Sequence, residues 1–153
     1  MPARRGRRPA DFALPIFMFA ILTKQFRFEA AHQLPNHRGK CARLHGHSYT
    51  LEVSLRGSVK AERGESDDGM VVDLDVIKEV VQAAVISRVD HFNLNEIIDG
   101  PTTAERIAHW IWDRLEEADP AFAAMLYRIR LWETATGYVE IGPPERDAAR
   151  GAR

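Results

Sequence analysis

Three histidines occur in a pattern that suits a metal ion. His45 and His47 are two residues apart, and the residues that follow them, 48–55, read as a β-strand. Side chains at positions i and i+2 of a strand share a face, so both imidazoles can reach one ion. Catalytic zinc sites usually take three protein ligands and keep one position open. His32 follows another strand-like segment, and the sequence therefore predicts a zinc site at His32, His45 and His47.

Each chemical pattern in the chain also has a structural alternative. A lone His-x-His pattern is weak evidence for a metal site, because strand histidines that bind no metal also occur at this spacing. The upstream histidine and the only cysteine of the chain, Cys41, which lies four residues before His45, favour the metal. Asp90 and His91 follow a predicted helix in a stretch too polar to continue it. This pair is either surface decoration or a carboxylate that orients an imidazole.

Five motifs occur in the order and at the spacing of the 6-pyruvoyltetrahydropterin synthase family, which the sequence resembles over residues 20–142. They are Phe28-Glu29-Ala30-Ala31-His32, Cys41 followed by His45-Gly46-His47, Asp90-His91, Pro101-Thr102-Thr103 and Trp132-Glu133-Thr134. The short spacing from the cysteine to the histidines and the residue pattern Lys-Cys-x-Arg-Leu-His-Gly-His at 40–47 most resemble the bacterial 6-carboxytetrahydropterin synthase branch. The resemblance thus implies an enzyme of carbon–carbon lyase type.

The resemblance implies a substrate and a reaction. The substrate would be 7,8-dihydroneopterin triphosphate, a small-molecule pterin. The products would be 6-carboxy-5,6,7,8-tetrahydropterin, acetaldehyde and triphosphate, on the route to queuosine. Zn²⁺ on the three histidines would act as a Lewis acid on the side-chain oxygens of the substrate.

The resemblance also implies roles for the other motif residues. Cys41 would be the general base, since nearby cations such as Lys40 and Arg43 favour a thiolate. The structural alternative is a small buried cysteine. His91 would be the second acid/base group, oriented by Asp90.

Three residues would bind the substrate if the resemblance holds. The Glu133 carboxylate would accept hydrogen bonds from the N–H donors of the pterin. Thr102 and Thr103 would add contacts, although the spacing of Thr102 and Glu105 also has the form of a helix-capping box.

Two enzymatic alternatives and one non-catalytic alternative stay open. The product could be 6-pyruvoyltetrahydropterin, but the short Cys-to-His spacing argues against that branch. A folate-pathway variant of the family places a glutamate where the base lies, and residues 42–44 contain no acid. A non-catalytic zinc-binding module would leave Cys41, Asp90, His91 and Glu133 without a shared purpose.

Length and composition indicate one domain. A chain of 153 residues fits a single domain, and its formal net charge of −1 indicates neither a nucleic-acid nor a membrane partner. No apolar stretch approaches the roughly 18 residues of a transmembrane helix. One cysteine allows no intrachain disulfide, which favours the reducing cytoplasm.

Hydrophobic spacing predicts an α+β fold with the order strand, strand, helix, helix, strand, strand. The predicted strands cover residues 20–31, 46–57, 124–133 and 136–142, and the predicted helices begin near residues 73 and 102. This ββααββ order implies a four-stranded antiparallel sheet with both helices on one face. The resemblance implies that such sheets close into a barrel, the tunnelling fold, within a homo-oligomer built as a hexamer of two trimers. Open sheet edges in a monomer agree with this.

The two ends of the chain differ from the domain at residues 20–142. Residues 1–19 contain four arginines between residues 4 and 8 and an apolar run interrupted by Pro15. We expect a disordered extension, or a segment upstream of a start at Met18. A signal peptide is the alternative, but no small-residue cleavage site precedes the first strand. Residues 143–153 combine prolines with mixed charge, so a disordered tail is expected.

Overall fold

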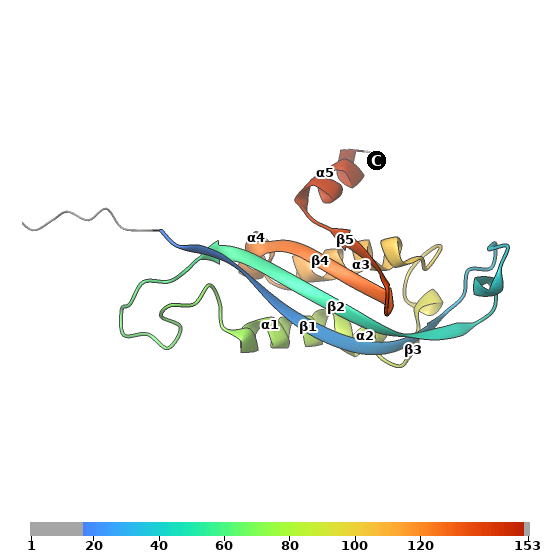
Figure 1. Cartoon of the computed structure of the whole chain (residues 1–153), viewed down its shortest axis with the longest axis horizontal. Helices are drawn as coiled ribbons and strands as arrows, with labels where there is room; N and C mark the ends of the chain where they lie inside the picture. The colour runs from blue at the N-terminus through green and yellow to red at the C-terminus, as the bar shows by residue number, and fades with distance from the viewer. Residues whose placement is uncertain (1–16, 152–153) are drawn as a thin grey trace, which may run out of the picture.

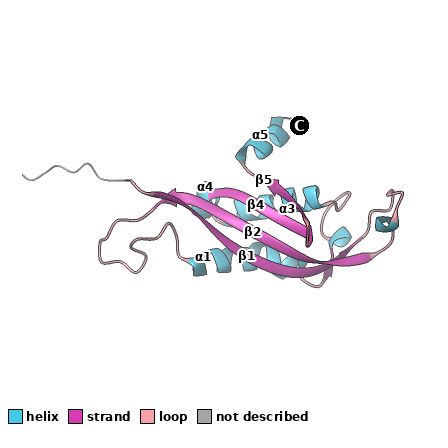
Figure 2. Cartoon of the chain, viewed as in Figure 1, coloured by secondary structure: helices cyan, strands magenta, loops and turns pink. Residues whose placement is uncertain are grey.

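A computed structural model describes residues 17–151 of the chain. Its elements form a sheet with a layer of helices on one side (Figures 1 and 2). The strands are β1 (Phe19–His32), β2 (His45–Ser58), β3 (Phe92–Asn93), β4 (Leu126–Thr134) and β5 (Gly137–Ile141), in the spatial order β3-β1-β2-β4-β5. The pairs β1–β2, β2–β4 and β4–β5 are antiparallel.

The prediction of a four-stranded antiparallel sheet is wrong by one strand. The four predicted strands are present, but β3 adds a fifth, which runs parallel to β1. The α+β class is confirmed. A strand of two residues has no side-chain period, and β3 forms because its backbone pairs with Ala30 and Ala31. This pairing fixes the position of the residues just before it, Asp90 and His91.

All helices but the last pack against one side of the sheet, and the last one contacts the longest helix through Arg146. They are α1 (Leu74–Val81), the π-helical segment η2 (Gln82–Ile86), α2 (Ser87–Val89), α3 (Ala104–Ala118), α4 (Pro120–Met125) and α5 (Pro143–Gly151). Two short 3-10 turns, η1 (Lys40–Ala42) and η3 (Leu94–Glu96), lie in connections. One apolar core joins Ile77 of α1 and Ile111 of α3 to Leu51 of β2.

The start of α3 differs from the prediction by one residue. Thr103, not Thr102, is the N-cap, and its side chain accepts from the backbone N–H of Arg106 at 3.5 Å. Thr102 is fully buried instead. The capping-box spacing did not reveal this, because the inward turn of Thr102 depends on a partner from β1. The helix itself extends to Ala118.

The sheet has two different faces. Along β2, Tyr49, Leu51 and Val53 are fully buried against the helices, whereas the residues between them are partly exposed. The opposite face is polar, and on it Arg130 forms ion pairs with Glu52 and Glu140. The same alternation extends back to the start of β2 and puts His45 and His47 on the helix side.

The C-terminal end of the described range differs from the prediction, and the N-terminal extension lies mostly outside that range. The predicted extension at residues 1–19 falls mostly outside the described residues, and β1 begins at Phe19. Residues 143–151 form α5, so the predicted disordered tail is wrong there. Arg146 of α5 is buried and forms ion pairs with Asp113 and Glu116 of α3. Within residues 17–151, no helix is both long and apolar enough to cross a bilayer.

Candidate metal centre and active site

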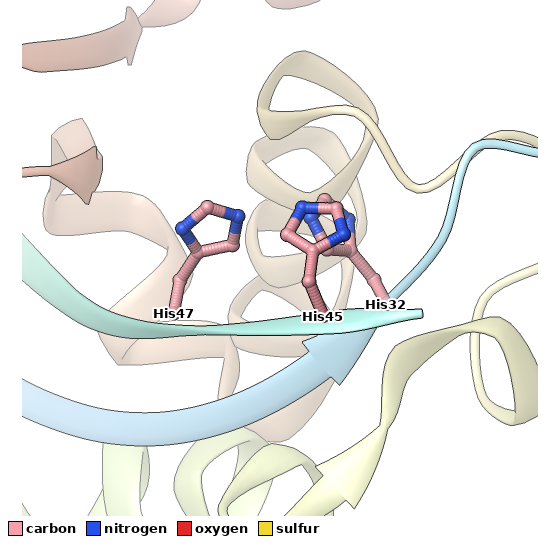
Figure 3. Close-up of side chains that lie close together, drawn as sticks. All are labelled: His32, His45 and His47. Atoms are coloured by element: carbon pink, nitrogen blue, oxygen red, sulfur yellow. The ribbon is translucent and has the colours of Figure 1, made fainter. Parts of the chain in front are cut away.

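The three predicted ligand histidines lie together at one end of the sheet (Figure 3). His32 is the last residue of β1 and is paired directly with His45, the first residue of β2. The ring centroids of the three residues are 4.6 to 5.0 Å apart. One ligand nitrogen from each residue lies within 4.8 Å of the others. The fold therefore gathers the three imidazoles where one ion can reach all of them.

The hydrogen bonds of two rings leave the opposite nitrogens free for a metal. The Nδ1 atom of His32 lies 2.8 Å from the carbonyl oxygen of Thr102, and Nδ1 of His45 lies 2.7 Å from that of Arg43. A carbonyl only accepts, so each Nδ1 carries the proton and each Nε2 keeps a lone pair. Nε2 of His32 is buried without a hydrogen-bond partner among the described residues. A buried acceptor of this kind fits a metal ligand.

Electrostatics favours the neutral, ligating form of His47. Burial lowers the pKa of His47, and the neighbouring His32 and His45 act in the same direction, while the Glu133 carboxylate opposes them. A neutral imidazole is the form that binds a metal. Three neutral imidazoles without a thiolate are a donor set that suits zinc.

Glu133 lies beside the histidine cluster at the end of β4. Its Oε1 atom is 3.6 Å from Nε2 of His32 and 3.9 Å from Nε2 of His47. Leu131 is paired with Leu51 on the core face, and Glu133, two residues on, shares that face. Glu133 and His47 also border a cleft of about 630 Å³, whose other walls come mostly from the polar face, including Arg27 and Glu52. The structure thus brings the predicted substrate anchor to the predicted metal centre.

Cys41 lies in the connection between two of the histidines. It belongs to η1, between His32 at the end of β1 and His45 at the start of β2. Its thiol is free and half-buried, and its carbonyl oxygen accepts from the backbone N–H of Leu34 at 2.8 Å. The chain connection keeps Cys41 at the histidine end of the sheet.

Asp90 and His91 form a rigid pair beside β1. The Asp90 carboxylate accepts from the backbone N–H of Glu29 at 2.9 Å and lies 3.0 Å from Nδ1 of His91. The backbone N–H of Glu29 lowers the pKa of Asp90, with His91 acting in the same direction. His91 has a φ of 64° and donates its backbone N–H to the carbonyl of Glu29 at 2.6 Å. The side chain of His91 is 77% exposed.

Within residues 17–151, no hydrogen bond joins the Asp90–His91 pair to the histidine cluster. His91 borders a cleft that Glu29, Ser48 and His47 also line. Glu29 and Ser48 are paired across β1 and β2, and they alternate with the buried residues Phe28 and Tyr49. Most of this cleft therefore lies on the polar face of the sheet, and His47 is the member of the histidine cluster that borders it.

The two threonines that were predicted to contact the substrate instead contact groups of the protein. Thr102 is fully buried, with its hydroxyl 3.3 Å from Nδ1 of His32, and Thr103 caps α3. Sequence reasoning missed that Thr102 orients a candidate ligand. It also missed Tyr49, whose ring lies 5.5 Å from that of His47. The signal for Tyr49 was its place two residues after His47 on the same strand face.

Comparisons with known proteins place the chain among pterin enzymes. Residues 21–144 match the family described as 6-pyruvoyl tetrahydropterin synthase. A relative from Synechocystis, named 6-carboxy-5,6,7,8-tetrahydropterin synthase, is 42% identical over 118 residues, which is 76% of this chain and 88% of the relative. The 6-pyruvoyl tetrahydrobiopterin synthase of Dictyostelium discoideum is 33% identical over 78% of this chain and 93% of its own length. A dihydroneopterin monophosphate aldolase from Pyrococcus furiosus is 40% identical, with 76% and 91% covered.

A solved structure supports the same relationship at the level of the fold. The 6-pyruvoyl tetrahydropterin synthase of Caenorhabditis elegans superposes with a TM-score of 0.71 at 26% identity, over 83% of this chain and 97% of the other. The sequence prediction of a pterin synthase-like enzyme is confirmed by these matches. The chain belongs to the 6-pyruvoyl tetrahydropterin synthase family.

Proposed function

We propose that this protein is a zinc-dependent 6-carboxytetrahydropterin synthase. It would convert 7,8-dihydroneopterin triphosphate to 6-carboxy-5,6,7,8-tetrahydropterin, with release of acetaldehyde and triphosphate, in queuosine biosynthesis. The observation that carries the proposal is the cluster of His32, His45 and His47, with the Glu133 carboxylate beside it. The name and 42% identity of the Synechocystis relative support the carboxy branch. The free thiol of Cys41 suits the cytoplasm.

Binding of the substrate would use both parts of this site. The three histidines would hold zinc, which polarises side-chain oxygens and acidifies the adjacent C–H bonds when it is bound. The Glu133 carboxylate would accept two N–H donors from the pterin ring, as carboxylates do with guanidine-like edges. Thr102 would act indirectly, because its carbonyl oxygen keeps the proton of His32 on Nδ1.

Proton transfer would use Cys41 and His91. The Cys41 thiolate would remove a proton from the side-chain carbon next to a coordinated oxygen. His91 would exchange a proton with a side-chain hydroxyl, with Asp90 holding its Nδ1 atom. Loss of triphosphate and transfer of hydrogen from the side chain to the dihydropterin ring would follow from these proton transfers. One water molecule would then add to the side-chain carbon next to the ring, so that breaking the following carbon–carbon bond leaves a carboxylate on the ring and releases acetaldehyde.

The position of the Asp90–His91 pair favours a site shared between subunits. The pair lies beside the edge of β1, without a hydrogen bond to the three histidines within residues 17–151, and its imidazole is exposed. The outer strands β3 and β5 each pair on one side only within the described chain. We therefore include in the proposal a homo-oligomer, a hexamer of two trimers with barrel-closed sheets, in which His91 serves the site of a neighbouring copy.

A second candidate product has one observation in its favour. The Dictyostelium relative, named 6-pyruvoyl tetrahydrobiopterin synthase, is 33% identical to this chain. In that case the reaction would stop after loss of triphosphate, without cleavage of a carbon–carbon bond. The three residues between Cys41 and His45 favour the carboxy branch over this alternative.

Product analysis distinguishes these reactions. The zinc-loaded protein would be incubated separately with 7,8-dihydroneopterin triphosphate and with its monophosphate, and the products would be identified by mass spectrometry. The proposal predicts 6-carboxytetrahydropterin and free triphosphate from the first substrate. Formation of 6-pyruvoyltetrahydropterin would favour the alternative. Turnover of the monophosphate alone would assign the chain the activity for which the Pyrococcus relative is named.

A further inference from the structure

Tyr49 lies behind the histidine cluster and has a hydroxyl group without an evident purpose. It is fully buried, and its ring stacks on that of Phe28 at a centroid distance of 4.8 Å. The ring is also 5.5 Å from the His47 ring and 6.4 Å from the His32 ring. Among the described residues, none forms a hydrogen bond with the hydroxyl. A phenylalanine would meet the packing requirement, so the buried hydroxyl needs another explanation.

The Glu133 carboxylate lies across the strand pair from Tyr49. Leu51 of β2 is paired with Leu131 of β4, so Tyr49 and Glu133, each two residues away, lie opposite each other on the helix side of the sheet. The hydroxyl of a tyrosine can donate one hydrogen bond. An ionised carboxylate only accepts hydrogen bonds, so the one favourable contact between these two side chains has Tyr49 as donor and Glu133 as acceptor.

Glu133 also lies close enough to the histidines to compete for a metal. Its Oε1 atom is 3.6 Å and 3.9 Å from the Nε2 atoms of His32 and His47. Carboxylates are good zinc ligands, and a fourth protein ligand would complete a tetrahedral site. Closed sites of that kind are structural, whereas catalytic sites keep a position for water or substrate. An active centre built on these three histidines therefore needs something that restrains Glu133.

We propose that the Tyr49 hydroxyl restrains the Glu133 carboxylate as an outer partner of the metal centre, and so keeps one coordination position open. This inference rests on the metal centre of the proposed function. Tyr49 is then a positioning residue, because it acts through Glu133 and does not touch the substrate. A hydrogen bond from Tyr49 to one oxygen of Glu133 would leave the second oxygen free to accept from a pterin N–H group.

Exogenous ligand binding measures whether a coordination position is open. Each variant would be loaded with Co²⁺, a visible substitute for zinc, and titrated with azide. The set is wild type, Tyr49→Phe, Glu133→Gln, the double variant, and Tyr127→Phe as the control. Tyr127 belongs to β4, and the guanidinium group of Arg56 lies over its ring. Removal of the Tyr127 hydroxyl therefore leaves the histidine cluster untouched. Metal affinity of each protein would be measured in parallel by competition with a chelator.

The inference predicts a specific pattern across the set. Tyr49→Phe should bind azide at least about tenfold more weakly and the metal about tenfold more tightly, within the range over which outer partners change metal affinity. The double variant should recover wild-type azide binding, because glutamine is a poor substitute ligand. Tyr127→Phe and Glu133→Gln should resemble wild type in both measurements. The melting temperature of metal-free Tyr49→Phe should stay close to that of wild type, because the ring keeps its packing and the partly exposed Glu133 carboxylate can bond to water instead.

Three results would overturn the inference. Tyr49→Phe could retain wild-type azide and metal affinities, or its loss of azide binding could persist in the double variant. A loss of metal affinity in Glu133→Gln alone would show that Glu133 already is a ligand in the wild type, and that test does not depend on Tyr49→Phe folding. A wild-type protein that binds no metal through its histidines would instead overturn the proposed centre, so the two failures are distinguishable.

Discussion

The Nδ1 atom of His32 and the carbonyl oxygen of Thr102 are 2.8 Å apart, and this contact joins the end of β1 to the residue before the N-cap of α3. It fixes the proton of the imidazole on the side away from the histidine cluster. Both residues are buried, so water does not compete for the hydrogen bond. The orientation of one candidate ligand thus depends on the packing of a helix against the sheet.

Loss of single histidines should separate the metal role from the structural role. His45→Ala should remove about one equivalent of zinc and leave the stability of the metal-free protein almost unchanged, because His45 is half-exposed. His32→Ala should remove the zinc and also cost about 1–3 kcal/mol of folding free energy, since the carbonyl of Thr102 loses its donor. Zinc content by elemental analysis and urea unfolding measure the two effects. His37→Ala, outside the cluster, is the control, and full zinc retention in both cluster variants would contradict the assignment.

Cys41→Ala should retain zinc and bind a pterin analogue normally but lose turnover. The reason is that a general base acts on the reaction and contributes little to ground-state binding. Zinc analysis, equilibrium binding and a turnover assay on the same preparation test this. If the variant loses its zinc, Cys41 is a metal ligand and the role proposed for it is wrong.

His91→Gly should separate catalysis from backbone strain. His91 has a φ of 64°, a conformation that is unfavourable for residues other than glycine. Glycine should therefore hold or raise the free energy of unfolding, by up to about 1 kcal/mol, while turnover is lost. His91→Ala should lose turnover without the gain in stability. A His91→Gly variant with full turnover would remove His91 from the reaction.

Glu133→Gln should weaken the binding of a pterin analogue by about 1–3 kcal/mol, because a donor would then face a donor. Within residues 17–151, no lysine or arginine forms an ion pair with Glu133, and its side chain is 30% exposed. The melting temperature should therefore hold. Calorimetric titration and a thermal melt check both statements. Unchanged affinity together with a lower melting temperature would give Glu133 a structural role instead.

Local patterns in the sequence predicted much of the sheet and the histidine cluster. Strict alternation along residues 46–57 was enough to place His45 and His47 on one face, and the pairing of β1 with β2 then brought His32 to them. The family motifs added Cys41, Asp90, His91 and Glu133, which no periodicity identifies.

The parts that sequence reasoning missed depend on contacts between distant segments. The two residues of β3 carry no pattern, and their pairing with β1 puts the Asp90–His91 pair beside the edge of β1. Helix α5 includes a buried arginine, Arg146, which composition assigns to solvent. Its burial is explained by Asp113, 33 residues earlier. The spacing of Thr102 likewise indicates a helix cap, and only its contact with His32 shows its actual role.

Acetaldehyde release is the most direct test of the central claim. The protein would be stripped of metal, divided, and assayed with 7,8-dihydroneopterin triphosphate before and after addition of one equivalent of zinc. We predict that only the zinc-loaded half releases acetaldehyde, in equal amount to 6-carboxytetrahydropterin, and that His45→Ala releases none in either state. Triphosphate release without acetaldehyde, or equal acetaldehyde release by the metal-free half, would contradict a zinc-dependent 6-carboxytetrahydropterin synthase.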